Sequence, residues 1–135
     1  MSQEFIPTFP IGTEFKSPNF TGRVFLGYLV EKNDVFPNAM ANVTFEPGCR
    51  NSWHSHPDGQ ILLCTDGEGY YQEKGKKIQL LQKGDVVKIL PNVVHWHGAT
   101  PTSWFSHIAC GVDSTKGPAV WLDPVSDEDY KSYSP

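Results

Sequence analysis

Two His-x-His pairs constrain the fold of this chain more than any other feature of its sequence. His54 and His56 form the first pair, with Gln60 four residues later, and His95 and His97 form the second. Side chains two residues apart on an extended strand point to the same face, so each pair can present two imidazoles to one site. The pattern therefore predicts a metal site in which His54 and His56 share a strand and His95 and Gln60 join from neighbouring strands.

The spacing of glycine and proline indicates an all-β protein. The 135 residues include 12 Gly and 11 Pro, which divide the chain into short segments rich in β-branched and aromatic residues. Such segments are typical of an antiparallel sandwich or barrel, and the length suits a single domain. The strands expected on this basis are Arg23–Val30, Met40–Glu46, Ser52–His56, Gln60–Thr65, Gly69–Lys74, Lys77–Leu81, Asp85–Ile89, His95–Ala99 and Trp104–Cys110.

We expect three parts along the chain. Residues 23–125 form the β-barrel. Residues 1–22 form an extended N-terminal arm, rich in Pro and Phe, which cannot bury itself alone. Residues 126–135 form a C-terminal tail or a short helical turn, because Ser126 can cap a first turn that carries acidic residues.

The charge and cysteine content exclude several classes of function. Eleven basic and 15 acidic residues give a net charge of -4 without a basic patch, so we expect no nucleic-acid partner. No signal-peptide pattern begins the chain and no apolar run reaches the length of a membrane span, so we expect no membrane partner. The three cysteines are odd in number and lack a CxxC spacing, which predicts reduced thiols and a cytoplasmic protein.

Strand parity brings further residues towards the histidines. Ala41, Val43 and Phe45 alternate along one face of an expected strand and would form a small apolar wall of a substrate pocket. His107 and Ala109 share a face of another expected strand, so the fifth histidine can join the same cavity. A one-residue bulge would turn either face over.

The first histidine segment resembles a motif of the cupin superfamily. That motif reads G-x5-H-x-H-x3-4-E-x6-G, and this chain matches it at Gly48, His54, His56, Gln60 and Gly67 with every spacing kept. Gln60 stands where the family usually has Glu.

The second cupin motif, G-x5-P-x-G-x2-H-x3-N, is matched in part. Gly84 and His95 are in register, whereas Leu90, Asn92 and Ala99 replace the Pro, Gly and Asn of the family pattern. Together the motifs cover most of the chain. The resemblance implies a single-domain antiparallel β-barrel of the cupin (double-stranded β-helix, jelly-roll) type, and it implies that arms such as residues 1–22 pair with a second subunit in a homodimer.

The resemblance also implies the ligands and the chemistry of the site. It places the metal on His54, His56, Gln60 and His95. The glutamine, the segment before it and the His-Trp-His-Gly-Ala stretch are most similar to the manganese-dependent, cupin-fold hydroxynitrile lyases of bacteria and their uncharacterised relatives. In that group the pocket histidines correspond to His97 and His107, and the small apolar wall to Ala41 and Val43.

The neutral amide of Gln60 is informative about the type of reaction. Imidazole suits Mn, Fe, Ni, Cu and Zn alike, so the histidines predict one divalent transition metal without naming it. The resemblance implies Mn, with Fe, Zn or Ni possible. Without a carboxylate ligand the ion keeps its full charge, which favours polarisation of a hydroxyl or carbonyl group over oxygen activation.

The expected reaction is a hydroxynitrile lyase-like cleavage of a small-molecule substrate. A cyanohydrin hydroxyl on the metal would lose its proton, and the carbon–carbon bond would break to give an aldehyde and cyanide. We assign His107 as the base and His97 as the group that holds or protonates cyanide, although the sequence leaves these roles interchangeable. Two alternatives stay open: an iron-containing cupin dioxygenase or isomerase, and a non-catalytic cupin that binds a metal or a small ligand.

Overall fold

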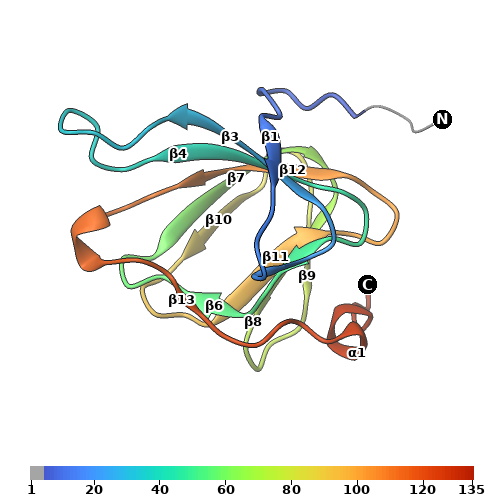
Figure 1. Ribbon diagram of the computed structural model, residues 1–135. Helices are drawn as coiled ribbons and strands as arrows, with labels where there is room; N and C mark the ends of the chain where they lie inside the picture. Colours follow the sequence, from blue (N-terminus) through green and yellow to red (C-terminus); the bar gives the residue numbers. More distant parts are fainter. Residues whose placement is uncertain (1–4) are drawn as a thin grey trace.

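The computed structural model describes residues 5–135, and this part of the chain is built almost entirely from antiparallel β-strands. The strands form two curled sheets that face each other (Figure 1). The six-stranded sheet, in spatial order, consists of β1 (Thr13–Phe15), β3 (Val24–Val30), β4 (Met40–Phe45), β12 (Phe105–Cys110), β7 (Gln60–Gly67) and β10 (Val86–Ile89).

The seven-stranded sheet carries His54, His95 and His97, and His56 follows directly after one of its strands. Its main path consists of β13 (Val120–Trp121), β6 (His54–Ser55), β11 (His95–Ala99), β5 (Arg50–Asn51) and β2 (Phe20–Thr21). On the other side of β11, β8 (Gly69–Glu73) pairs with β11 and with β9 (Gln79–Leu81). The all-β, antiparallel barrel expected from the sequence is therefore the observed fold.

The space between the sheets holds an apolar core beside the histidines. Phe45, Leu62 and Phe105 are fully buried there, and Val24, Leu81 and Ala99 complete the centre of the same cluster. These residues come from strands of both sheets, so the core fixes the distance between the sheets. The histidine site lies at the edge of a rigid, close-packed interior.

The expected strands recur with shifted limits, and one of them is divided. The expected strand Ser52–His56 is represented only by β6, because a break at Ser52 and Trp53 separates it from β5. The N–H groups of these two residues bind Asn19 O and Asp123 O instead of a neighbouring strand. Four short strands, β1, β2, β5 and β13, were not expected from the sequence.

The N-terminal arm packs on its own chain where the structure describes it. β1 pairs with β3 and β2 pairs with β5. Asn42 Nδ2 donates to the carbonyl oxygens of Phe9 and Pro10, at 3.3 and 3.1 Å, so the arm covers the outer face of β4. Pairing of the arm with a second subunit stays a prediction, and residues 1–4 of that arm lie outside the described residues.

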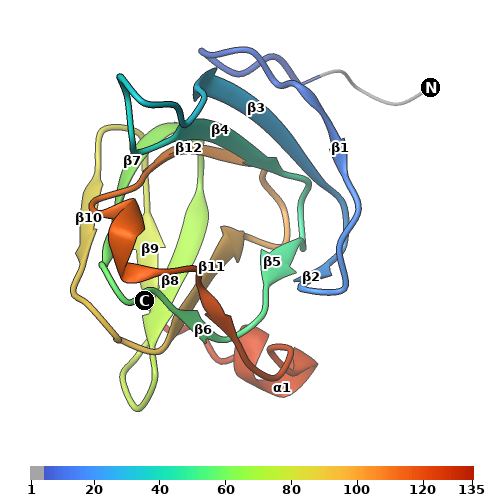
Figure 2. The ribbon, with the colours of Figure 1, turned by 60° about the vertical axis from the view of Figure 1, so that its left-hand side comes forward.

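The C-terminal segment covers the outer face of the other sheet. Ser126 caps α1 (Asp127–Tyr130), where its Oγ accepts from the Asp129 N–H. Tyr130 packs with Trp53 and Trp96 in a second apolar cluster, and Arg50 donates to Val125 O and Asp127. Figure 2 shows α1 outside the barrel, away from the space between the sheets. Within residues 5–135 we find no helix of sufficient length and apolarity to cross a membrane.

Candidate metal centre and its cavity

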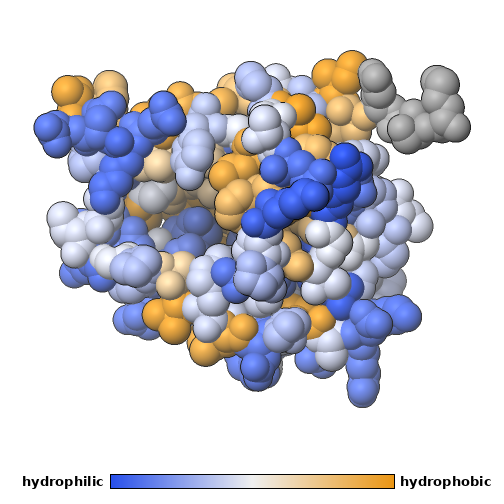
Figure 3. Space-filling view, in the orientation of Figure 1, coloured by the Kyte–Doolittle hydropathy of each residue, from blue (hydrophilic) through white to orange (hydrophobic). Residues whose placement is uncertain are grey.

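A cavity of about 140 Å³ lies between the two sheets. Figure 3 shows this face of the molecule hollowed between the sheets. Polar side chains line one part of the cavity and apolar side chains line the other. The polar lining consists of Asn51, His54, His56, Gln60, His97 and His107, and the apolar lining of Phe20, Val43, Ala109 and Trp121.

His54 and His95 are held by the same type of main-chain contact. They pair across β6 and β11, and their ring centroids are 4.3 Å apart. His54 Nδ1 lies 2.8 Å from Ser52 O, and His95 Nδ1 lies 2.9 Å from Val93 O. Because a carbonyl oxygen only accepts, each Nδ1 carries the proton and each Nε2 keeps its lone pair. This orientation is the one that metal-binding histidines adopt.

Several buried polar atoms at this place have no hydrogen-bond partner. They include Nε2 of His56, Nε2 of His95 and Oε1 of Gln60. The ring of His56 lies 5.0 Å from that of His54 and 5.6 Å from that of His95, between centroids. Unpaired buried acceptors are costly, and a cation bound among them would satisfy all of them together. The donor set therefore fits a divalent transition metal.

A second combination of histidines also comes close together. One ring nitrogen each of His54, His95 and His97 lies within 4.8 Å of the others, so these three residues could hold a metal ion. His97, however, already contacts other side chains: its Nδ1 lies 3.1 Å from His107 Nε2, and its ring lies against the Asn51 amide. The unpaired atoms of His56 and Gln60 favour these two residues over His97 as ligands.

All five histidines are neutral at neutral pH. Burial lowers the pKa of His54 to about 3, that of His95 to about 4 and that of His107 to about 3. Burial also lowers the pKa of His56, and it lowers the pKa of His97 well below its ordinary value. The neutral imidazole is both the form that ligates metals and the form that accepts a proton.

The residues predicted to form the substrate pocket divide into three groups. Val43 and Ala109 line the histidine cavity. Ala41 and Ala109 line a neighbouring cavity of about 280 Å³, which shares Gln60 with the first. Phe45 is fully buried in the core, where its ring packs 6.0 Å from His97 and 5.5 Å from His107.

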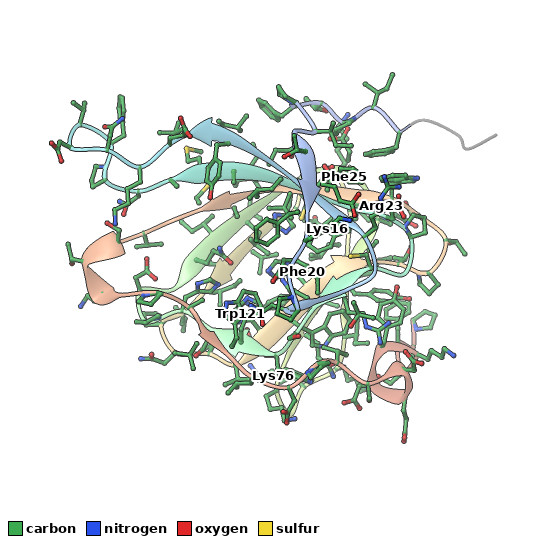
Figure 4. All side chains as sticks on the ribbon, in the orientation of Figure 1. Lys16, Phe20, Arg23, Phe25, Lys76 and Trp121 are labelled. Carbon is green, nitrogen blue, oxygen red and sulfur yellow. The ribbon has the colours of Figure 1, made fainter. Side chains whose placement is uncertain are left out.

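Three cavity residues were missed by sequence reasoning: Asn51, Phe20 and Trp121. The Trp121 ring stacks on His54 with 4.4 Å between centroids, and Phe20 lies 6.1 Å from Trp121. Figure 4 shows Phe20 and Trp121 side by side in front of the strands that carry the histidines. Both aromatic residues lie on two-residue strands that were not expected. The alternation of side chains along a strand therefore could not be used to predict their positions.

The chain is similar to proteins of known family. The profile of the family described as Cupin domain matches residues 41–108. A relative from Granulicella tundricola named (R)-mandelonitrile lyase is 43% identical over 113 residues, which cover 83% of this chain and 86% of that protein.

Solved structures agree with this assignment. A cupin-like protein from Thermotoga maritima superposes with a TM-score of 0.90 and 48% identity, covering 94% of this chain and 96% of that one. A cupin 2 conserved barrel domain protein from Rhodopseudomonas palustris superposes with a TM-score of 0.70 over 87% of this chain and 78% of that one, and its 16% identity shows the fold alone. The present chain is a small, single-domain protein of the cupin superfamily.

Proposed function

We propose that this protein is a metal-dependent lyase that cleaves hydroxynitriles into an aldehyde or ketone and hydrogen cyanide. The observation that carries the proposal is a cavity lined by His56, Gln60 and the neutral pair of His97 and His107, with unpaired, buried ligand atoms on His56, on Gln60 and on the adjacent His95. The identity of 43% with a protein named (R)-mandelonitrile lyase supports the same reaction.

The metal ligands in this proposal are His54, His56, His95 and Gln60. Nε2 of His56 and of His95 and Oε1 of Gln60 have no other partner, and Nε2 of His54 is left free by the contact of its Nδ1 with Ser52 O. We favour manganese, because a carboxamide oxygen is a hard donor and such donors suit Mn²⁺. When bound, the ion supplies Lewis-acid stabilisation of negative charge on the substrate oxygen, and the four neutral donors leave its charge undiminished.

The histidine pair moves the proton in this proposal. With Nε2 of His107 donating to Nδ1 of His97 at 3.1 Å, Nδ1 of His107 keeps a lone pair, and that atom has no other partner. His107 therefore takes the hydroxyl proton of the substrate as the carbon–carbon bond breaks. The electron pair of that bond leaves on cyanide. His97 holds the cyanide, which receives a proton from the histidine pair and leaves as hydrogen cyanide.

The apolar lining supports a small substrate with an apolar group. Val43 and Ala109 contribute small side chains, and Phe20 and Trp121 contribute aromatic surface on the other side. A cavity of about 140 Å³ suits a small molecule. Water is largely kept from the reacting atoms, because His97 and His107 are buried.

The free cysteines support a cytosolic location, which is part of the proposal. Cys49, Cys64 and Cys110 form no disulfide, and burial raises the pKa of Cys49 and of Cys64 to about 12. Thiols of this kind persist in a reducing compartment and are unreactive there.

Cleavage of mandelonitrile by protein stripped of metal and reloaded with Mn²⁺ tests the proposal. We expect activity only in the loaded protein, and His107→Ala should reduce kcat by about 100-fold or more while the bound metal is retained. Ser106→Ala is a matched control, because Ser106 is buried on the same strand but binds Thr44 on the opposite face. Absence of cleavage in the loaded protein, or an activity that needs iron and oxygen, would contradict the lyase assignment.

A further inference from the structure

The side chain of Asn51 contacts His97 twice. Asn51 is buried at the end of β5, and its Oδ1 accepts from the main-chain N–H of His97 at 2.9 Å. Its Nδ2 lies 3.2 Å from Nε2 and 3.4 Å from Nδ1 of the same imidazole. Because an N–H group can only donate, the first contact fixes the orientation of the amide, and the NH₂ group must face the ring.

The main-chain contact compensates for the break in the neighbouring strand. β11 pairs with β5 at Gly98–Arg50 and with β6 at His95–His54. Between these two pairs the chain turns away, since the N–H groups of Ser52 and Trp53 bind other segments. Asn51 Oδ1 therefore serves as the acceptor that the interrupted strand does not offer to the His97 N–H.

The second contact fixes the plane of the His97 ring. The two distances from Asn51 Nδ2 to the ring nitrogens are almost equal, so the amide lies over the face of the imidazole and not at one in-plane lone pair. An N–H group over an aromatic face is a weak but attractive contact. The edge of the ring is fixed as well, because Nδ1 of His97 meets Nε2 of His107 at 3.1 Å.

We propose that Asn51 is a positioning residue for the histidine pair: it holds the main chain and the ring of His97 so that Nδ1 stays within hydrogen-bonding distance of His107. The role of the pair in turnover rests on the proposed function, whereas the position of the ring does not. A displacement of about 1 Å in such a group can reduce the rate about 100-fold.

Two variants separate the main-chain contact from the ring contact. Asn51→Ala removes both contacts. Asn51→Asp has nearly the same shape and keeps an oxygen for the His97 N–H, but it replaces the NH₂ group over the ring with a second oxygen. Asn42→Ala is the matched control, because Asn42 is an equally buried asparagine that binds Phe9 O and Pro10 O and contacts no histidine.

The experiment combines crystal structures of the manganese-loaded variants with steady-state kinetics on mandelonitrile. We expect the His97 ring to leave hydrogen-bonding distance of His107 in both Asn51 variants. We also expect kcat to fall about 10- to 100-fold with KM and metal content unchanged, and Asn42→Ala to keep the wild-type kcat. Asn51→Asp tests the proposal even if Asn51→Ala does not fold.

The failures of the two proposals can be told apart. A His97 ring that stays in place in Asn51→Asp, or a wild-type kcat in that variant, would overturn the positioning role. A displaced ring in a protein whose wild type cleaves no hydroxynitrile would support the positioning role and contradict the lyase assignment.

Discussion

His54 and His95 are each oriented by the main chain that immediately precedes them. Each ring donates from Nδ1 to the carbonyl oxygen two residues earlier, Ser52 O or Val93 O. The contact is local, so the orientation of both rings is present before any metal binds. Such outer contacts fix the tautomer of a ligand and raise its basicity.

The sequence was sufficient to predict that the histidines share one site, because the alternation of side chains along a strand is a local property. His54 and His56, two residues apart, line the same cavity, and so do His97, His107 and Ala109. The register of β12 against β7 shifts between Ser106 and His107, where Thr65 of β7 is left unpaired. Because the extra residue lies on β7, the alternation along β12 is preserved.

Asn51 and Trp121 could not be placed from the sequence. Asn51 belongs to a two-residue strand that was not expected, and its role depends on the break at Ser52 and Trp53. Trp121 reaches His54 from a segment close to the C-terminus, through pairing of β13 with β6. Such pairings are decided by tertiary contacts, which override the weak preferences of short segments.

We predict that acid destabilises the metal-free protein. His54, His95 and His107 have folded-state pKa values of about 3, 4 and 3, whereas an unfolded histidine titrates near 6.5. Below about pH 6.5 the unfolded chain therefore binds protons that the folded chain does not, and stability falls by about 1.4 kcal/mol per pH unit for each imidazole.

Urea unfolding of metal-free protein at pH 7.5, 6.5 and 5.5 measures this loss. The decrease in the free energy of unfolding should lie below pH 6.5 and extend to about pH 4. His107→Asn should reduce the slope of this free energy against pH by about 1.4 kcal/mol per pH unit, because one titrating imidazole is removed. Equal stability at pH 7.5 and 5.5 would show that the histidines are not buried in the neutral form.

At the scale of elements, the N-terminal arm stabilises the six-stranded sheet from outside. Its main chain approaches β3 so closely that a Cβ atom on Gly27 would lie 2.6 Å from Pro10 O. Asn42 on β4 binds the arm at the same place, and Thr44 and Ser106 are buried beside it. The arm thus covers the polar face of β4. The alternation of polar and apolar residues along β4 does not reveal that this face is covered.

We predict that Gly27→Ala destabilises the protein by about 1–3 kcal/mol, because the added methyl group would push the arm from the sheet. Gly111→Ala is the control, since a Cβ atom there meets nothing closer than 3.5 Å. Urea unfolding of both variants measures the difference. Equal stability of the two variants would mean that the arm does not pack tightly on β3.

The barrel itself was predicted from the sequence, because turn residues and alternation define most of its strands independently. The expected limits for β11 are those observed, and the limits of β3, β4, β7, β8, β9, β10 and β12 differ by one or two residues. The short strands β1, β2, β5 and β13 were not predicted, because two or three residues carry no detectable alternation.

At the scale of the whole molecule, apolar side chains of the arm and of the β3–β4 hairpin face water in the single chain. They include Ile6, Phe9, Phe15, Tyr28 and Phe36. Exposure of several large apolar side chains on neighbouring elements is common at surfaces that contact another protein. It supports the expectation that the protein is a homodimer.

We predict twice the chain mass in light scattering of the full-length protein at micromolar concentration. Replacement of Ile6 and Phe9 by Ser should shift the mass towards that of one chain, because these side chains would be lost from the interface. Leu90→Ser serves as the control, because Leu90 is exposed but belongs neither to the arm nor to the β3–β4 hairpin. The mass of a single chain for the unaltered protein would contradict the prediction.

The central claim is that four neutral side chains bind one transition metal ion: His54, His56 and Gln60, which line the histidine cavity, and the adjacent His95. Anomalous diffraction from crystals of protein stripped with chelator and reloaded with Mn²⁺ tests it most directly. We predict one strong peak per chain, bounded by Nε2 of His54, His56 and His95 and by Oε1 of Gln60. A cavity without a peak, or a peak only at the protein surface, would contradict the claim.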